Sequence, residues 1–342
     1  MIPSIEWVDE ENKVKMIDQT LLPHELKFLE FEDYREVANS ITVMNIRGAP
    51  AIGAAASMAM ALATLEYKDL SKDEFLEKMN EAANHMRKAR PTASNLFWAV
   101  NRMMKIIENS NGSPSEISEE IVEEAKLVAQ EDVNVNKSIG KHGAEILADG
   151  DTVLTHCNAG SLATVQYGTA LAPVRAAIEQ RKKISVVADE TRPRLQGARL
   201  TAYECQYDKI PVKVCADNSS GLLMKLGKID KVIVGTDRVS SDAVFNKIGT
   251  YLVALAAKDN NIPFYVACPR STLSLKDTID DVEIEQRDSG EVSKILGKVQ
   301  VTPEGVECLN YAFDITPFRL VTGIITEDGV FTPEEMLKKY KE

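Results

Sequence analysis

Residues 151–161 read DTVLTHCNAGS, a short apolar run that ends in a polar turn. A run of this kind, here residues 152–156, is typical of a strand buried in a sheet. Five more β-rich runs follow, at residues 184–188, 212–215, 232–235, 264–267 and 320–325. Helix-length segments such as 162–181 and 244–258 separate most of them. This alternation predicts right-handed βαβ units in a doubly wound parallel sheet, and therefore an α/β fold.

The N-terminal part of the chain has a different pattern. Residues 5–8 and 14–17, joined by the turn-like residues 9–12, predict a β-hairpin. From about residue 34 to residue 141 the apolar residues recur with helical spacing. Two capping boxes, Ser71 with Glu74 and Ser113 with Glu116, mark helix starts in this region. We expect a mainly helical domain with a β-hairpin over residues 1–136 and the doubly wound domain over residues 137–342.

Composition narrows the classes of partner. The formal net charge is −12, which disfavours a broad nucleic-acid-binding surface. The first residues lack a cationic stretch followed by an apolar run, so no signal or transit peptide is expected and the cytoplasm is the expected location. The uncharged residues 48–65 consist mainly of Ala, Gly and Met, which predicts a closely packed buried helix rather than a membrane span.

Neither a metal nor a nucleotide cofactor is expected. The five cysteines are far apart in the sequence, without a CxxC pair or a histidine at ligand spacing. The turn after residues 152–156 is not a G-x-G-x-x-G, and no Walker-type GK[ST] sequence occurs.

Reactive side chains are sought at the carboxyl ends of the strands, where open α/β sheets bind their ligands. Cys157 follows the first run, and a helix starting near Leu162 would favour its thiolate; the alternative is a packing residue. Asp237 follows residues 232–235, where burial would keep it protonated as a general acid; the alternative is a helix N-cap or a partner for Arg238. His156, without an acid near it in the sequence, is interpreted as a structural residue.

Four polar clusters at predicted helix starts could bind an anion. They are Arg47-Gly48-Ala49-Pro50, Arg90-Pro91-Thr92-Ala93, Arg192-Pro193-Arg194-Leu195-Gln196-Gly197 and Asn246-Lys247-Ile248-Gly249. Amides at a helix start attract phosphate, and the planar guanidinium group of arginine matches a pair of phosphate oxygens. A surface salt bridge is the alternative for each arginine. Four such clusters in one acidic chain favour a phosphate-bearing ligand.

Several long strings resemble one family. They are RGAPAIG (47–53), RPTASNLFWA (90–99), THCNAGSLAT (155–164), ETRPRLQGARLTAYE (190–204), NKIGTY (246–251), PFYVACPRST (263–272) and AFDITP (312–317). Together they span nearly the whole chain and closely resemble the methylthioribose-1-phosphate isomerase family. That family is part of a wider one with other sugar-phosphate isomerases and the alpha, beta and delta regulatory subunits of translation initiation factor 2B.

The resemblance implies a helical N-terminal domain with a small antiparallel sheet, a Rossmann-like C-terminal domain without a nucleotide, and a homodimer. It implies isomerisation of 5-methylthioribose 1-phosphate to 5-methylthioribulose 1-phosphate in methionine salvage, without a cofactor. By motif match, Cys157 and Asp237 would be the catalytic pair. Substrate contacts would come from Arg47, Gly48, Ala49, Arg90, Gln196, Asn246 and Lys247.

The chain departs from the family pattern between Gly235 and Asn246. The family usually reads GADRI followed by a short stretch with Asn-Gly-Asp, whereas this segment looks one residue shorter and lacks Asn-Gly. Altered specificity, for instance toward 5-deoxyribose 1-phosphate, follows as a hypothesis. A ribose-1,5-bisphosphate isomerase and a non-catalytic regulatory subunit remain the alternatives. A methylthio group would need an apolar pocket, for which Phe97 and Trp98 are candidates, although both suit a plain helix core.

Overall fold

The computed structural model describes residues 1–91 and 93–340, so Thr92 of the RPTA string lies outside the described residues. Contacts within the chain divide it into two compact units. The first contains Met1–Asn134 together with Ser161–Gly168, and the second contains Val135–Gly160 and the chain from Thr169 onward. The boundary therefore lies inside helix α5 (Pro114–Ala144).

The first unit begins with a small antiparallel sheet of β1 (Ile5–Val8), β2 (Lys13–Ile17) and β3 (Phe28–Phe31), in that order. Trp7 pairs with Val14, which confirms the predicted hairpin, and β3 extends it by one strand. Residues 161–168 belong to this unit because they bond to it: Ser4 N donates to the Val165 carbonyl at 2.9 Å, and Val165 N donates to Asp132 at 2.7 Å.

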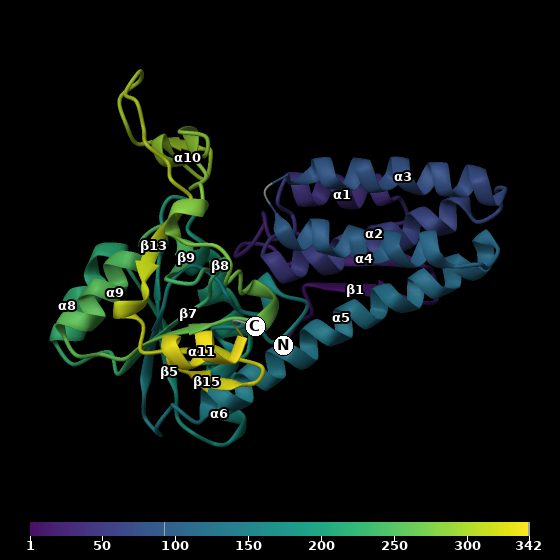
Figure 1. Cartoon of the computed structure of the whole chain (residues 1–342). Helices are drawn as coiled ribbons and strands as arrows, with labels where there is room; N and C mark the ends of the chain where they lie inside the picture. Colours follow the sequence, from purple (N-terminus) through teal and green to yellow (C-terminus); the bar gives the residue numbers. More distant parts are fainter. Residues whose placement is uncertain (92, 341–342) are drawn as a thin grey trace. The chain divides into compact units, whose positions relative to one another are not determined.

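Helices make up the rest of the first unit, as the helical spacing predicts. They are α1 (Tyr34–Thr42), α2 (Ala49–Tyr67), α3 (Lys72–Ala89), α4 (Ser94–Asn109) and the first part of α5 (Figure 1). Within the described residues, α2 is the one helix long and apolar enough to cross a membrane, and 78% of its most apolar window is buried inside the protein. The expected buried helix is therefore confirmed.

The second unit is built on a seven-stranded sheet. Its strands are β4 (Thr152–Thr155), β5 (Ser185–Asp189), β6 (Val212–Cys215), β7 (Lys231–Val234), β10 (Phe264–Ala267), β14 (Gly323–Thr326) and β15 (Gly329–Phe331). Their order is β15-β14-β10-β7-β4-β5-β6. Strand β15 is antiparallel to β14, and the other six strands are parallel to one another. The strand order reverses between β4 and β7, as in doubly wound sheets. The predicted α/β fold is confirmed.

Helices cover the two faces of this sheet. Ile324 and Ile325 are neighbours on β14 and therefore point to opposite faces. Ile324 packs in the core shared with α8 (Ser220–Lys225), α9 (Thr250–Asp259) and α11 (Pro333–Tyr340). Ile325 faces Gly143 of α5, which lies against Pro173 of α6 (Ala172–Glu179). In Figure 1, α8 and α9 accordingly lie apart from α6.

Two predicted helices are shorter than expected. Instead of one helix over 162–181, a 3-10 turn at Ser161–Ala163 leads into irregular chain, and α6 begins at Ala172. The Ala159 carbonyl accepts from the Thr169 and Ala170 amides, which folds the intervening residues into a loop. Instead of a helix over 244–258, Ala243–Lys247 forms strand β9 and α9 follows it, because β9 pairs with β13 (Phe313–Pro317).

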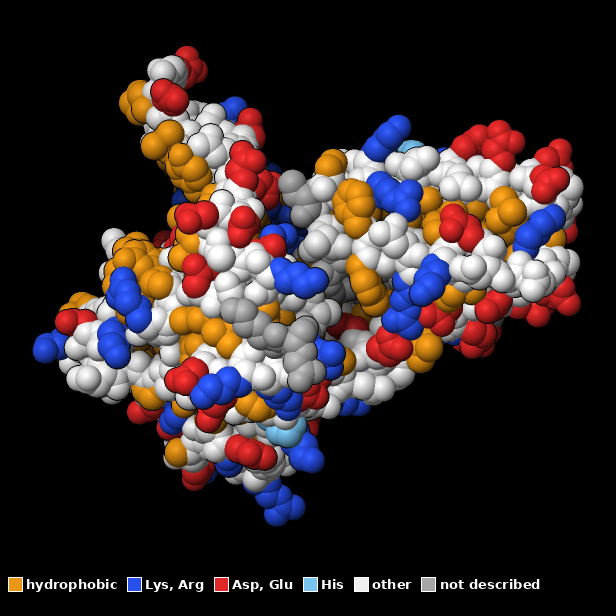
Figure 2. All heavy atoms as spheres, in the orientation of Figure 1, with side chains coloured by type: hydrophobic (Ala, Val, Ile, Leu, Met, Phe, Trp, Pro, Cys, Tyr) orange, Lys and Arg blue, Asp and Glu red, His pale blue; other side chains and the backbone are white. Residues whose placement is uncertain are grey.

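A smaller sheet and an arm complete the second unit. Strand β9 lies between β13 and β8 (Arg238–Val239) in an antiparallel sheet. Between β10 and β13 the chain extends outward through α10 (Gly290–Ser293), β11 (Lys294–Ile295) and β12 (Val299–Gln300). We call residues 282–311 the arm. It projects from this unit beside β13 in Figure 1, and apolar side chains lie on its surface in Figure 2.

Candidate active site

The order of the strands brings two predicted residues to one edge. Cys157 comes two residues after the end of β4, and Asp237 comes three residues after the end of β7. These strands are parallel neighbours, with Leu154 paired with Val232. The carboxyl ends of parallel strands at a reversal of strand order are where doubly wound proteins bind ligands. Cys157 and Asp237, 80 residues apart in sequence by subtraction of their numbers, therefore flank the expected binding edge.

Cys157 is held by its backbone. Its φ of 65° lies in the left-handed region. Residues with a side chain seldom adopt this conformation, and those that do are frequently found at functional sites. The Cys157 amide donates to the Thr191 hydroxyl at 2.8 Å, and the Thr201 hydroxyl donates to the Cys157 carbonyl at 2.7 Å. The expected helix start beside the thiol is wrong, since only the 3-10 turn Ser161–Ala163 follows. Two threonine hydroxyls therefore fix this residue.

Asp237 differs from the expectation in its exposure. The apolar run is buried only through Gly235, and Asp237 itself is exposed. Its amide donates to the Phe245 carbonyl at 3.0 Å, and the chain continues into β8. The expectation that burial keeps Asp237 protonated is therefore wrong for this structure. The N-cap alternative is also wrong, because strand β8 and not a helix follows.

Lys247 connects the two. It is 6% exposed, its ammonium group donates to the Ala312 carbonyl at 2.7 Å, and it lies 4.5 Å from the centre of the Phe313 ring. Burial lowers the pKa of Lys247, while the charges of Cys157 and Asp237 act in the opposite direction. Lys247 is thus within electrostatic range of both Cys157 and Asp237.

Two further predicted contacts lie in the second unit. Asn246 is 5% exposed, and its amide donates to the Thr250 hydroxyl at 3.0 Å. Gln196 is 7% exposed, and within the described residues its buried Oε1 accepts no hydrogen bond. Because a buried polar atom without a partner is costly, Gln196 has the capacity to bind a hydroxyl donor.

The shortened segment after Gly235 is a tight hairpin of β8 and β9 rather than an open loop. The Ser240 hydroxyl donates to Asp242 at 2.7 Å inside the turn. The Ser241 amide donates to the Asp277 carbonyl at 2.9 Å, and Arg238 pairs with the Asp277 carboxylate at 3.2 Å. The hairpin and residue 277 therefore fix the backbone that follows Asp237.

The other predicted contacts belong to the first unit. Gly48, with φ of 96°, is the N-cap of α2, and a Cβ there would lie 2.3 Å from the Ala163 carbonyl oxygen, so only glycine fits. Arg47 precedes it and Ala49 starts the helix. Arg90 lies between α3 and α4. A Cβ on Gly53 would lie 3.5 Å from the Asn95 carbonyl, so the starts of α2 and α4 are neighbours.

Two arginines of the 192–197 cluster are bound by the protein itself. Arg194 pairs with Glu291 at 2.5 Å. Arg192 donates to the carbonyls of Pro193 and Val292 at 2.6 and 2.9 Å. For Arg194 the salt-bridge alternative is correct, whereas Arg192 binds backbone carbonyls and not a carboxylate; the arm contacts both guanidinium groups, through Glu291 and Val292.

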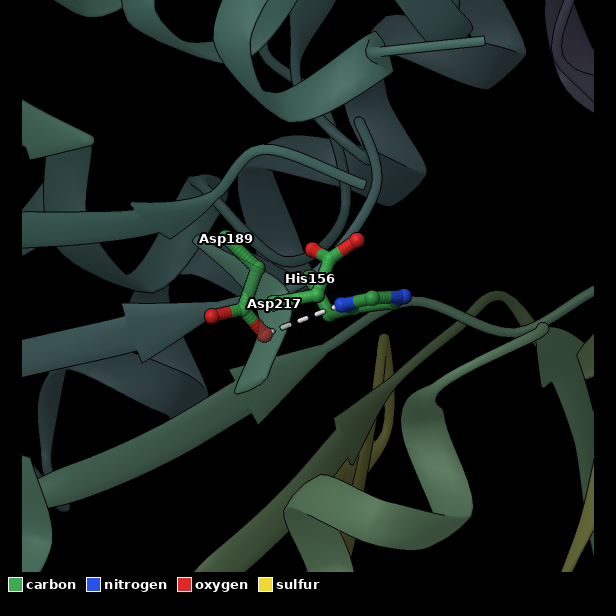
Figure 3. Close-up of side chains that lie close together, drawn as sticks. All are labelled: His156, Asp189 and Asp217. Atoms are coloured by element: carbon green, nitrogen blue, oxygen red, sulfur yellow. Dashed lines mark hydrogen bonds and ion pairs between the residues drawn. The ribbon is translucent and has the colours of Figure 1, made fainter. Parts of the chain in front are cut away.

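His156 has acidic neighbours that its sequence context does not reveal. Its Nδ1 lies 2.9 Å from the Asp189 carboxylate, and its Nε2 lies 2.8 Å from the Ile248 carbonyl oxygen. The Asp217 carboxylate lies close to both the imidazole and the Asp189 carboxylate (Figure 3). Burial alone would lower the pKa of His156, but Asp189, the Ile248 carbonyl and Asp217 raise it above its ordinary value. Both ring nitrogens face acceptors, and this geometry and the raised pKa both favour the imidazolium form.

The same three residues could be considered for a metal ion, since their ligand atoms lie within 4.8 Å of one another. A protonated imidazole is not a metal ligand. Asp189 also accepts from the Ser220 hydroxyl at 2.6 Å, and Asp217 accepts from the Thr191 and Arg192 amides at 2.7 Å each. The hydrogen-bonding capacity of the group is used within the protein, so it forms a buried network and not a metal site.

Asp314 of the AFDITP string is a functional neighbour that sequence reasoning missed. Its carboxylate accepts from the Gly249 amide at 2.7 Å and the Tyr251 amide at 3.1 Å, at the start of α9. Burial raises the pKa of Asp314 to about 6, partly opposed by these amides and by the charges of His156 and Lys247. An acid within an otherwise apolar string was the available signal.

The fold is thus that of a doubly wound α/β protein, and its cysteine, aspartate and buried lysine lie at the reversal of strand order, the edge where this class binds ligands. The chain belongs to the initiation factor 2 subunit family, whose model matches residues 45–333. It is 52% identical over 340 residues to methylthioribose-1-phosphate isomerase of Thermosipho africanus, covering 98% of this chain and 97% of that protein.

Two solved structures are similar over nearly the whole chain. The structure described as translation initiation factor eIF-2B, subunit delta, from A. fulgidus has a TM-score of 0.93 and 46% identity, with 100% of both chains covered. The 5-methylthioribose 1-phosphate isomerase from Pyrococcus horikoshii has a TM-score of 0.93 and 43% identity, covering 99% of this chain and 95% of that one. The family resemblance expected from the sequence is therefore confirmed.

From the raised pKa of Asp314 we predict how the free energy of unfolding depends on pH. The folded state binds a proton at this group more tightly than the unfolded chain, whose carboxyl has the ordinary pKa of 3.8. The contribution of Asp314 to the free energy of unfolding therefore falls as pH rises from about 4 to about 6, by at most about 3 kcal/mol. The difference in free energy of unfolding between wild type and Asp314→Asn, measured in urea, should fall over this range. A constant difference would contradict the assignment.

Proposed function

We propose that the protein is a cofactor-independent aldose-ketose isomerase that converts 5-methylthioribose 1-phosphate to 5-methylthioribulose 1-phosphate, a reaction of methionine salvage. The observation that carries the proposal is that Cys157 and Asp237 follow neighbouring parallel strands at the reversal of strand order, with the buried Lys247 within electrostatic range of both. The similarity to proteins named as this isomerase, at 52% identity for the Thermosipho africanus protein, supports the choice of substrate.

The substrate chemistry requires a general acid. Phosphate on the anomeric oxygen leaves no free hemiacetal, so the ring cannot open as in an ordinary aldose. Asp237 protonates the ring oxygen as the bond from that oxygen to C1 breaks. Because Asp237 is exposed in this structure, we infer that the bound substrate covers it, and that exclusion of water then favours its protonated form.

Hydrogen then moves from C2 to C1, and the C2 hydroxyl gives its proton to the Asp237 carboxylate, which forms the ketone and restores the acid. Two routes keep the atoms balanced. In one, the Cys157 thiolate abstracts the C2 proton through an enediol-like species and returns a proton to C1. In the other, a hydride moves directly while Cys157 shapes the site. In both, the Cys157 backbone, fixed by Thr191 and Thr201, holds the sulfur in one place.

Binding of the substrate is assigned to the predicted contact residues. Arg47, Arg90 and the amides of Gly48 and Ala49 suit the phosphate, because guanidinium groups and helix-start amides bind phosphate oxygens. Asn246, Lys247 and Gln196 suit the sugar hydroxyls. Lys247 is already held by the Ala312 carbonyl, so it keeps its position as the substrate binds.

The apolar pocket for the methylthio group is a separate part of the proposal. Trp98 is 48% exposed and lies 5.4 Å from Arg102, whereas Phe97 is half-buried against the core of the first unit. Trp98 is therefore the better candidate of the two for contact with a thioether.

Substitution of the catalytic pair tests the reaction. Cys157→Ser and Asp237→Asn should each lower kcat/KM for 5-methylthioribose 1-phosphate by about 10²- to 10⁴-fold, the range that a general acid or base contributes. Cys308→Ser on the arm and Asp280→Asn on the surface are the matched controls and should retain wild-type kinetics. Ketose formation is measured with each purified variant.

The same assay decides among substrates. A higher kcat/KM with 5-deoxyribose 1-phosphate would assign a specificity role to the β8–β9 hairpin, and a higher value with ribose 1,5-bisphosphate would favour that isomerase. If the wild-type protein turned over none of the three substrates, the proposal that it is an isomerase would be wrong. That result would favour the alternative of a non-catalytic regulatory subunit; the similar A. fulgidus protein is described as subunit delta of translation initiation factor eIF-2B.

We further propose that the protein is a homodimer in the cytoplasm, with neither nucleic acid nor membrane as a partner. The net charge of −12 argues against nucleic acid as a partner, and the burial of α2 argues against a membrane. For the dimer, three leucines on adjacent helices of the second unit support an interface: Leu222, Leu226 and Leu252 are 61%, 59% and 69% exposed. A Cβ on Gly221 of α8 would lie 3.5 Å from Ala256 of α9, so the exposed leucines belong to two helices that lie against each other.

Charges on this surface should disrupt the dimer. The double variant Leu222→Asp with Leu252→Asp should sediment as a monomer at concentrations where the wild type is a dimer, because a buried unpaired carboxylate opposes association. Leu309→Asp on the arm, where Leu309 is 72% exposed, is the control and should remain dimeric. Analytical ultracentrifugation measures both. An unchanged dimer in the double variant would place the interface elsewhere.

A further inference from the structure

The segment that carries Asn246 and Lys247 continues through Ile248 and Gly249 into α9, and several bonds fix it. The Ile248 amide donates to the Ala312 carbonyl at 3.1 Å, and the Gly249 amide donates to Asp314 at 2.7 Å. These two bonds tie the segment to β13 and the residue before it. They leave its position relative to the end of β4, which Cys157 follows, to other contacts.

His156 supplies the contact with β4. Its backbone is the residue immediately before Cys157, and its Nε2 donates to the Ile248 carbonyl at 2.8 Å. Gly249 lies directly against the same ring: a Cβ there would be 2.7 Å from Cε1 and 2.9 Å from Nε2 of His156. The ring therefore fills the space between the two segments and bonds across it.

The ring is itself fixed from behind. Nδ1 lies 2.9 Å from Asp189, the last residue of β5, which is fully buried and also accepts from the Ser220 hydroxyl at 2.6 Å. A ring held at both nitrogens cannot rotate without losing a bond. Three elements thus meet at one side chain: the end of β4, the end of β5 and the segment between β9 and α9.

We propose that His156 is a positioning residue that sets the distance between Cys157 and the substrate-binding pair Asn246 and Lys247. It acts through the Ile248 carbonyl and takes no part in proton transfer to the substrate. Its importance for catalysis rests on the proposed function, whereas its effect on the 246–250 backbone does not. The His156–Asp189 bond orients the ring, and the His156–Ile248 bond transmits its position.

Two variants distinguish the effect of the His156–Ile248 bond from that of the His156–Asp189 bond. Loss of His156 alone would leave the buried Asp189 charge unpaired and risk unfolding, so both variants also carry Asp189→Asn. His156→Gln keeps an N–H at the depth of Nε2, which reaches Ile248. His156→Asn keeps one only at the depth of Nδ1, which faces residue 189. The two double variants have the same charge and differ in the bond to the 246–250 segment.

Hydrogen exchange measured by mass spectrometry is the test that needs no substrate. Amides in peptides covering residues 246–253 should exchange about tenfold or more faster with His156→Asn than with His156→Gln, because local opening follows the loss of a bond. Peptides covering β10 should exchange equally in the two variants, which shows that both are folded. Equal exchange over 246–253 would overturn the proposal.

Kinetics test the consequence for the site. KM for 5-methylthioribose 1-phosphate should rise about tenfold to a hundredfold more with His156→Asn than with His156→Gln, since misplacement of binding groups by about 1 Å has effects of this size. Gly249→Ala, which leaves the charged pair intact, should also raise KM. Equal KM values for the two double variants would overturn the catalytic part. An inactive wild type would refute the proposed function instead, and hydrogen exchange would still decide the positioning role.

Discussion

Hydrogen bonding between β4 and β7 is the constraint on which the site depends. These strands are about 80 residues apart in sequence, and their parallel pairing puts the residues after them at a single edge of the sheet. The following residues then leave the sheet in opposite directions, toward β5 on one side and β10 on the other. A protein with this strand order has a ligand-binding edge before any particular side chain is considered.

Buried charge defines that edge further. His156 is paired with Asp189, and the ammonium group of Lys247 is buried against the Ala312 carbonyl, with the charges of Cys157 and Asp237 nearby. Burying an ammonium group is costly unless negative or polar groups surround it. Hydrogen bonds from this ammonium group to the hydroxyls of a bound sugar would reduce the cost, as the proposed role of Lys247 requires. The His156 pair is neutral overall and fits a role in holding the backbone.

The sequence was sufficient for elements whose pattern is local. The apolar runs that became β4, β5, β7 and β10 are recognisable because strands inside a parallel sheet are covered on both faces. Sequence reasoning failed where the structure of a segment depends on a distant part of the chain. Residues 243–247 form a strand because β13 pairs with them. The buried segment after β7 ends at Gly235, so Asp237 is exposed. Asp189 could not be assigned to His156, because only the order of the strands brings them together. Cys157 was found from its place after a strand, but the hydroxyls that hold it come from residues 34 and 44 positions later.

Alkylation of the cysteines measures directly whether a sugar 1-phosphate binds at the edge where Cys157 lies. Cys157 and Cys308 are both half-buried, and Cys308 lies on the arm. The purified protein is treated with iodoacetamide with and without 5-methylthioribose 1-phosphate, and modification of each cysteine is followed by mass spectrometry. We predict that the substrate slows modification of Cys157 and leaves that of Cys308 unchanged. Equal modification of Cys157 in both conditions, at a substrate concentration that saturates turnover, would contradict binding at this edge.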